Sequence, residues 1–265
     1  MSRLFNVLMA CWLLLSAALF PFKVQASEKL WQSPQFKTTL VELYTSEGCS
    51  SCPPADRWVS GLKKNKGLWE SLIPVTFHVD YWNYLGWRDR YAQALFSHRQ
   101  RTHQADGNSR AVYTPGFIVD GKEWRGFFIR RSLSEPTGEN VGILSGHLDL
   151  SRNYFEVSFV PISSFSKLLT LHIAWLGMDV SSSVISGENA GKQLRHDFVV
   201  LNYKMLDGQL ESSRYGWQLK VGSHDLTHQE TGEQADAIAF WVTEKNSLLP
   251  IQAAGGFLGQ KSQLK

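Results

Sequence analysis

The pattern of hydrophobic and polar positions changes character near residue 140. Before that point, two short apolar runs rich in β-forming residues, TTLVELYT (38–45) and IPVTFHVD (73–80), are typical of buried strands. Each is followed by a stretch with helical spacing. The first of these begins at Pro53, with proline in its first turn, and the second spans residues 87–104. This half of the chain is therefore predicted to alternate strands and helices.

A hairpin and a short helix are expected to complete this first region. After YTP (113–115), the segment GFIVDGKEWRGF carries Asp120-Gly121, a two-residue hairpin signal between alternating strands. A short helix is expected around FIRRSLS (128–134). The segment SEPTGEN (134–140) then combines proline, glycine and polar residues without apolar periodicity, which predicts a linker.

Beyond the linker, the helical periodicity disappears. Strand-like runs follow, separated by the turn compositions SRN, SGENAG, LDGQ and TGEQ. This pattern predicts an antiparallel sandwich or partial barrel. We therefore expect two domains, at residues 30–138 and 139–265. The strand-like runs of the second are GILSGHLDL, YFEVSFVPI, LLTLHIAWLGM, HDFVVLNYKML, YGWQLKV and AIAFWVT.

The N-terminus predicts an exported protein. Arg3 precedes the apolar run VLMACWLLLSAALF, and Ala26 provides a small residue for signal-peptidase cleavage, so residues 1–26 are predicted to be a signal peptide. The alternative is a retained membrane anchor, but the run is short for a span of about 20 residues and Pro21 and Lys23 interrupt it. We expect a periplasmic or secreted protein whose mature form is not in a membrane.

Removal of the signal peptide changes the charge and the cysteine count. Arg3 and Lys23 would leave with it, which lowers the formal net charge from +3 to +1. A nearly neutral chain gives no reason to expect nucleic-acid binding. Cys11 would leave as well, so that Cys49 and Cys52 remain. Two cysteines do not make a disulfide scaffold, and stability must come from a buried apolar core.

The segment YTSEGCSSCPPAD places these two cysteines directly before the predicted helix at Pro53. The unpaired N–H groups and the positive end of the helix dipole would stabilise a thiolate on Cys49, which is expected to be the accessible, attacking sulfur. Cys52 would be the buried sulfur that closes the disulfide. Glu47 opposes thiolate formation, and Asp56 either relays protons or favours the helix start.

The order of strand, CxxC, helix, strand, helix, X-Pro and hairpin resembles the thioredoxin fold as seen in glutaredoxins. The resemblance implies an α/β thioredoxin-like domain followed by an all-β antiparallel sandwich-like domain. Four segments, ELYTSEGCSSCPPAD, HVDYWNYLGWRDR, YTPGFIVDG and GENAGKQLRHDFVV, more narrowly resemble a family of secreted bacterial thioredoxin-like proteins that is known only as a domain of unknown function.

The resemblance to the thioredoxin fold implies thiol-disulfide exchange with protein thiols and disulfides, by cysteine chemistry alone and without an organic cofactor. It adds Pro115 to the catalytic residues Cys49 and Cys52 and implies a cis Thr114-Pro115 bond beside the CxxC. Tyr113 and Thr114 would bind an extended substrate. The aromatic cluster DYWNYLGW, which contains Trp82, is interpreted either as the floor of a peptide groove or as a packed loop cap.

Two alternatives remain open for the cysteines. One is a copper-binding chaperone in which Cys49, Cys52 and His78 hold Cu(I), since His78 lies on the second predicted strand and thiolates favour that ion. The other is a binding module that is not an enzyme, with a structural disulfide. The remaining histidines give no ligand spacing. They are His98, His103, His147, His172, His196, His224 and His228.

Overall fold

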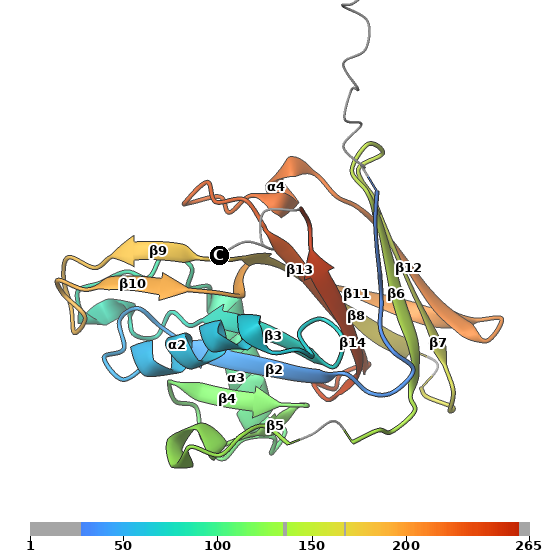
Figure 1. Cartoon of the computed structure of the whole chain (residues 1–265), viewed down its shortest axis with the longest axis horizontal. Helices are drawn as coiled ribbons and strands as arrows, with labels where there is room; N and C mark the ends of the chain where they lie inside the picture. The colour runs from blue at the N-terminus through green and yellow to red at the C-terminus, as the bar shows by residue number, and fades with distance from the viewer. Residues whose placement is uncertain (1–27, 135–136, 167, 260–265) are drawn as a thin grey trace, which may run out of the picture.

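Strands from both halves of the chain pair in one mixed sheet of 12 strands (Figure 1). The structure is a computed structural model and describes residues 28–134, 137–166 and 168–259. The predicted signal peptide over residues 1–26 lies outside the described residues.

Within residues 28–134, the first half contains five strands and two α-helices. The elements are β1 (Glu28–Gln32), β2 (Thr39–Thr45), α2 (Pro53–Gly61), η1 (Leu62–Lys64), β3 (Leu72–His78), η2 (Asn83–Leu85), α3 (Ala94–Ala105), β4 (Gly116–Val119), β5 (Lys122–Glu123) and η3 (Gly126–Ile129).

The regular elements of the second half, within the described residues, are strands except for the short helix α4. They are β6 (Gly142–Asp149), β7 (Tyr154–Pro161), β8 (Leu168–Gly177), β9 (Val180–Ser183), β10 (Gln193–His196), β11 (Val199–Glu211), β12 (Arg214–Lys220), α4 (Ser223–Leu226), β13 (Ala237–Glu244) and β14 (Pro250–Phe257).

The main order of strands in the large sheet is β1-β6-β7-β12-β11-β3-β2-β4-β5. In addition, β8 pairs with β11 and β13, and β14 pairs with β13. A separate two-stranded sheet is formed by β9 and β10.

Several local predictions are confirmed. Helix α2 begins at Pro53, and Asp120 and Gly121 form the turn between β4 and β5, both with the positive φ that a two-residue hairpin turn requires. The second helix is shorter than predicted, because α3 begins only at Ala94 and residues 87–93 precede it without helix. The expected helix at 128–134 is wrong, since only the short 3₁₀ turn η3 forms there.

The predicted fold class, an α/β thioredoxin-like domain followed by an all-β antiparallel sandwich-like domain, is wrong. The chain is mostly β, and its two halves share one sheet. β11 makes the connection, because Val199 pairs in parallel with Thr76 of β3 and the strand then continues antiparallel to β8. In addition, β1 of the first half pairs with β6 of the second half. The division of the chain at residue 139 stays a prediction.

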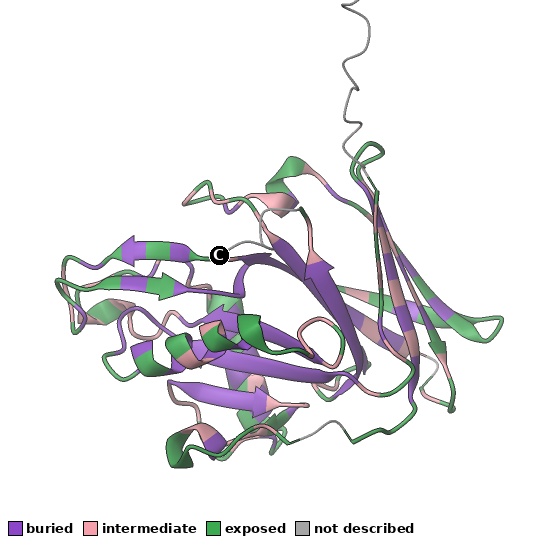
Figure 2. Cartoon of the chain, in the orientation of Figure 1, coloured by how far each residue is buried: buried purple, intermediate pink, exposed green. Residues whose placement is uncertain are grey.

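The burial of β2 and β3 explains why their apolar pattern fits both the predicted α/β domain and the observed mixed sheet. Every residue of both strands is buried (Figure 2), so an apolar layer must cover each face. One face packs against Ala55 and Val59 of α2. The other face packs against Phe96 of α3 and, in addition, against residues of second-half strands such as Trp241 and Ala253. An apolar run predicts burial but does not identify the element that provides it.

The β9–β10 hairpin projects from the main sheet and contacts α2 (Figure 1). It carries the segment SGENAG (186–191) in its loop, as the turn composition predicts. The hairpin therefore brings residues near position 190 to the region of the CxxC. None of the helices within the described residues is long and apolar enough to span a membrane.

Candidate functional site

Cys49 and Cys52 form a disulfide between the end of β2 and the start of α2. Their Cα atoms are 5.5 Å apart, as expected for a disulfide. Cys52 is the residue that caps α2, and its carbonyl accepts hydrogen bonds from the N–H groups of Ala55 and Asp56. The sequence therefore predicted the position of the pair correctly.

The expectation of an accessible sulfur on Cys49 is wrong. Cys49 is 2% exposed and Cys52 is 0% exposed, although Ser50 and Ser51 between them are exposed. The Cys49 Sγ lies 3.3 Å from the hydroxyl of Ser51. In this conformation a protein partner would have to move part of the surrounding chain before it reached either sulfur.

The loop of the β9–β10 hairpin is bound to the CxxC turn. The Asn189 side-chain amide donates hydrogen bonds to the carbonyl oxygens of Glu47 and Cys49, at 2.8 and 2.9 Å. A carboxylate oxygen of Glu188 accepts a hydrogen bond from the N–H of Ser50 at 3.0 Å. Hydrogen bonds from Ser50 lower the pKa of Glu188 below its ordinary value. These bonds hold the hairpin loop on the turn that contains the disulfide.

Three buried ionisable side chains meet next to the disulfide. His196, at the end of β10, has its Nε2 3.4 Å from an oxygen of Glu47 and its Nδ1 3.6 Å from an oxygen of Asp56. Burial lowers the pKa of His196, but the charges of Asp56 and Glu47 outweigh it and raise the pKa to about 10. The ring is therefore charged at neutral pH.

His78 and Asp89 lie directly behind this cluster. The His78 ring centroid is 4.9 Å from that of His196, and its Nδ1 is 2.7 Å from a carboxylate oxygen of Asp89. The same oxygen accepts a hydrogen bond from the N–H of Glu47. Although burial raises the pKa of Asp89, the interactions with His78 and with backbone N–H groups lower it overall. The cluster of three side chains and the His78–Asp89 pair form one continuous group of buried ionisable side chains beside the CxxC.

The alternative copper site used His78 together with the two cysteines. In the structure the Nδ1 atom of His78 contacts Asp89, and Nε2 has no hydrogen-bond partner among the described residues. Within residues 28–134, 137–166 and 168–259, no group of three or more His, Cys, Asp and Glu side chains is arranged to hold a metal ion.

Of the predicted substrate residues, Trp82 contacts the CxxC turn and Thr114 is hydrogen-bonded to Trp82. The Thr114-Pro115 bond is cis, as predicted. Trp82 donates a hydrogen bond from its indole nitrogen to the Thr114 hydroxyl at 2.7 Å. Trp82 also packs on Gly48, where a Cβ atom would lie 3.1 Å from the Cβ of Trp82. Trp82 therefore connects the loop that contains Pro115 to the residue that precedes Cys49.

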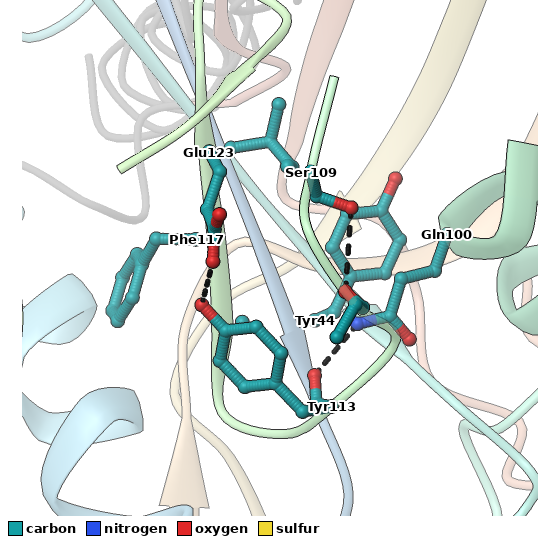
Figure 3. Close-up of a pocket in the computed structure, with 9 residues that line it drawn as sticks. Tyr44, Gln100, Ser109, Tyr113, Phe117 and Glu123 are labelled. Carbon is teal, nitrogen blue, oxygen red and sulfur yellow. Dashed lines mark hydrogen bonds between the residues drawn. The ribbon is translucent and has the colours of Figure 1, made fainter. Parts of the chain in front are cut away.

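Tyr113, the third predicted substrate residue, makes hydrogen bonds through both its side chain and its backbone (Figure 3). Its hydroxyl donates to Glu123 and its carbonyl accepts from the amide of Gln100, each at 2.7 Å. Burial, with the hydrogen bond to Glu123, raises the pKa of Tyr113. The adjoining cavity measures about 10 Å³, which is enough for one water molecule. It is too small for a substrate.

Apart from the groups beside the CxxC, Arg99 and Glu42 form a buried ion pair in the core. The Arg99 guanidinium donates to both carboxylate oxygens of Glu42, at 2.8 and 3.0 Å, and packs against the rings of Phe77, Tyr203 and Trp241. Burial raises the pKa of Glu42, but Arg99 outweighs it with the help of neighbouring groups, and the pKa falls well below the ordinary value. The geometry is that of a satisfied structural pair.

Four residues of the site were not predicted from the sequence: Asp89, Glu188, Asn189 and His196. Their one signal was their position inside the segments HVDYWNYLGWRDR and GENAGKQLRHDFVV, which carried the family resemblance. Local patterning could not place these segments beside the CxxC, because their proximity depends on how the two halves pair.

The fold and the site define a mixed-β protein with a CxxC disulfide beside a buried group of charges. A family model described as a protein of unknown function (DUF1223) matches residues 40–243, and the chain belongs to this family. The predicted resemblance to a family of unknown function is thus confirmed, whereas its assignment to the thioredoxin-like superfamily is not.

Two solved structures are similar in fold. The crystal structure of protein AGR_C_4864 from Agrobacterium tumefaciens, a structural genomics target, has a TM-score of 0.63 and 22% identity, covering 88% of this chain and 99% of that chain. HBP35 of Porphyromonas gingivalis has a TM-score of 0.51 and 12% identity, covering 88% and 80%. No curated protein matches the chain. At these identities the comparisons describe the fold alone.

Proposed function

We propose that this protein is an exported thiol-disulfide oxidoreductase that exchanges disulfides with protein partners through Cys49 and Cys52. The observation that carries the proposal is the position of the disulfide beside the buried side chains of Glu47, Asp56 and His196. Burying charges is costly, and a disulfide that only closes a turn does not need them. Strongly perturbed ionisable groups are concentrated at functional sites.

The proposed exchange uses the two sulfurs in sequence. In the reduced protein, the Cys49 thiolate attacks a partner disulfide, forms a mixed disulfide and releases one partner thiol. The Cys52 thiolate then attacks the Cys49 sulfur, closes the Cys49–Cys52 bond and releases the second partner thiol. The partner is reduced and the protein is oxidised by two electrons. The reverse sequence oxidises a partner dithiol, and the relative reduction potentials decide the direction.

Access to Cys49 requires a movement of the hairpin loop in this proposal. Glu188 and Asn189 bind the backbone of the CxxC turn. In this proposal the turn is freed from these hydrogen bonds before a partner reaches the Cys49 sulfur. Trp82 and Thr114, which are connected to the turn through Gly48, would then lie beside the incoming partner. Export depends on the predicted signal peptide and would place the reaction in an oxidising compartment.

One observation favours a second candidate, a binding module with a fixed structural disulfide. Both sulfurs are buried, which is typical of disulfides that do not exchange. In that case Cys49→Ser and Cys52→Ser would have the same effect, a loss of at most about 2 kcal/mol of stability for so short a loop.

Trapping of mixed disulfides separates the two candidates. Cys52→Ser should accumulate covalent complexes with partner proteins, because the attacking thiol remains while the thiol that resolves the complex is absent. Cys49→Ser is the matched control and should trap nothing. Complexes are detected as species that disappear on reduction in non-reducing gels. Equal behaviour of the two variants, with no covalent complex, would reject exchange in favour of the structural disulfide.

A further inference from the structure

The three side chains beside the disulfide come from three separate parts of the chain. Glu47 precedes Cys49 by two residues, Asp56 lies in the first turn of α2, and His196 ends β10. Each is at least nine-tenths buried. Exchange as described above assigns a role to the two sulfurs but none to these groups.

Their contacts leave hydrogen-bonding capacity unused. One oxygen of Glu47 accepts a 2.7 Å hydrogen bond from the indole of Trp87, but the other only faces His196. Both oxygens of Asp56 and both ring nitrogens of His196 lack a hydrogen-bond partner among the described residues. Charged pairs that serve stability alone are usually closer, at about 2.7–2.9 Å, with their remaining atoms satisfied. This arrangement suits groups that exchange a proton.

Asp56 is the member of the cluster that lies on the same helix as Cys52. The two residues are four positions apart at the start of α2, Cys52 already has helical dihedral angles, and the N–H of Asp56 bonds to the carbonyl of Cys52. Side chains with this spacing lie on the same helix face, one turn apart. Both are buried, so solvent has little access to the Cys52 sulfur.

We infer that His196 is the proton donor and acceptor for this disulfide. It gives a proton through Asp56 to the Cys52 sulfur when the disulfide is reduced and takes the proton back when the disulfide forms again. The inference rests on the proposed function and assigns His196 and Asp56 as positioning and proton-transfer residues. The charged state of the His196 ring at neutral pH, caused by the two carboxylates, is the state in which a proton is available.

In the proposed reduction step, a partner thiolate attacks the Cys49 sulfur and forms the mixed disulfide, and the electron pair of the broken Cys49–Cys52 bond goes to the Cys52 sulfur. The Asp56 carboxylate takes the proton of the charged His196 ring and passes it to that sulfur. The Cys52 thiol and a neutral ring result. On oxidation the neutral ring withdraws the proton again, and the Cys52 thiolate attacks the Cys49 sulfur of the mixed disulfide.

Several charged or titratable groups face His196 and would set its proton affinity. Its own neighbour Asp197 is neutralised by Lys63 at 2.7 Å. The groups around the ring are Glu47 from the loop after β2, Asp56 from α2, His78 from β3, and Asp89, which contacts His78.

The direct test is the protonation state of the His196 ring in the two redox states. Ring nitrogen chemical shifts are measured by NMR at pH 7 for the purified protein as the disulfide and after reduction by a phosphine, which needs no biological partner. We expect a charged ring in the disulfide form and a neutral ring in the dithiol form. A ring that is charged in both forms would overturn the inference and leave a structural ion pair.

The exchange equilibrium with glutathione gives an independent readout. If reduction takes one proton from His196 rather than from solvent, the equilibrium constant for reduction depends on pH. For each unit by which the pH rises, this constant should increase by a factor about ten times larger in the wild type than in His196→Gln. The control is His147→Gln, a surface histidine of β6, which should retain the wild-type slope. Equal slopes in all three proteins would also overturn the inference.

The outcomes separate this inference from the proposed function. Absence of trapped partners with Cys52→Ser rejects exchange, whereas the NMR comparison still reports where the proton resides. If His196→Gln does not fold, the wild-type NMR comparison alone decides. Reduction that unfolds the protein would reject both, because no folded dithiol state would then exist.

Discussion

The side-chain amide of Asn189 donates a 2.9 Å hydrogen bond to the carbonyl of Cys49, which lies 140 residues earlier in the chain. The same amide binds the carbonyl of Glu47 at 2.8 Å. Lys192 in turn donates to the Asn189 side-chain oxygen. One side chain therefore fixes the hairpin loop to the turn that contains the disulfide.

Asn189→Ala should make the disulfide more reactive and the protein less stable. The two carbonyls would lose their buried donor, which costs about 1–3 kcal/mol. Reduction by dithiothreitol should be faster because the loop opens more often, and the free energy of unfolding in urea should fall. Gln193→Ala, at an exposed position of β10, is the control. An unchanged reduction rate in Asn189→Ala would show that the loop does not limit access.

Arg99→Met should strongly destabilise the protein. It would leave the Glu42 carboxylate buried without its ion-pair partner, and removal of one partner of such a pair costs about 3–5 kcal/mol. Urea unfolding measures the change. The double variant Glu42→Gln, Arg99→Met should recover part of the loss, because no unpaired charge remains. A single variant with wild-type stability would contradict the description of a tightly paired core.

Stability should fall at alkaline pH because of His196. The pKa of this side chain is about 10 in the folded protein and 6.5 in the reference state. The folded protein thus binds the proton more tightly, so the contribution of His196 is complete below about pH 6.5 and is lost as the pH rises through 10. Urea unfolding of the wild type and His196→Gln should give curves that converge between pH 7 and 10. Parallel curves would contradict the raised pKa.

Trp82→Phe should weaken partner binding more than folding. The substitution removes the hydrogen bond to Thr114 but keeps an aromatic ring on Gly48, so stability should fall by about 0.5–1.5 kcal/mol. In the Cys52→Ser background, Trp82→Phe should reduce the yield of trapped partners. Tyr84→Phe, at an exposed position of the same aromatic cluster, is the control. Undiminished trapping would favour the interpretation of Trp82 as part of a packed loop cap.

The sequence predicted local features because their causes are local. Proline at Pro53 fits the first turn of a helix, and Asp120 and Gly121 tolerate the positive φ of a tight hairpin. The fold class failed because it depends on a distant pairing. Nothing in the residues around Thr76 specifies that Val199 completes the sheet beside them.

The same distinction holds within the site. The CxxC is visible as a motif, and its disulfide requires only two nearby cysteines. His196 gave no ligand spacing in the sequence, because its partners Glu47 and Asp56 belong to the other half of the chain. The hydrogen bonds that hold the CxxC turn were equally unpredictable, since they are made by Glu188 and Asn189 of the β9–β10 hairpin.

Because second-half strands pack against β2 and β3, we expect that the CxxC region does not fold without them. Residues such as Leu40, Val75 and Phe77 need Trp241 and Ala253 as their cover. A fragment containing only residues 30–138 would expose this apolar face and the free edge of β3 to other copies of itself, and the fragment would aggregate. The CxxC motif and the β strands that follow it would therefore have to be inherited and engineered together.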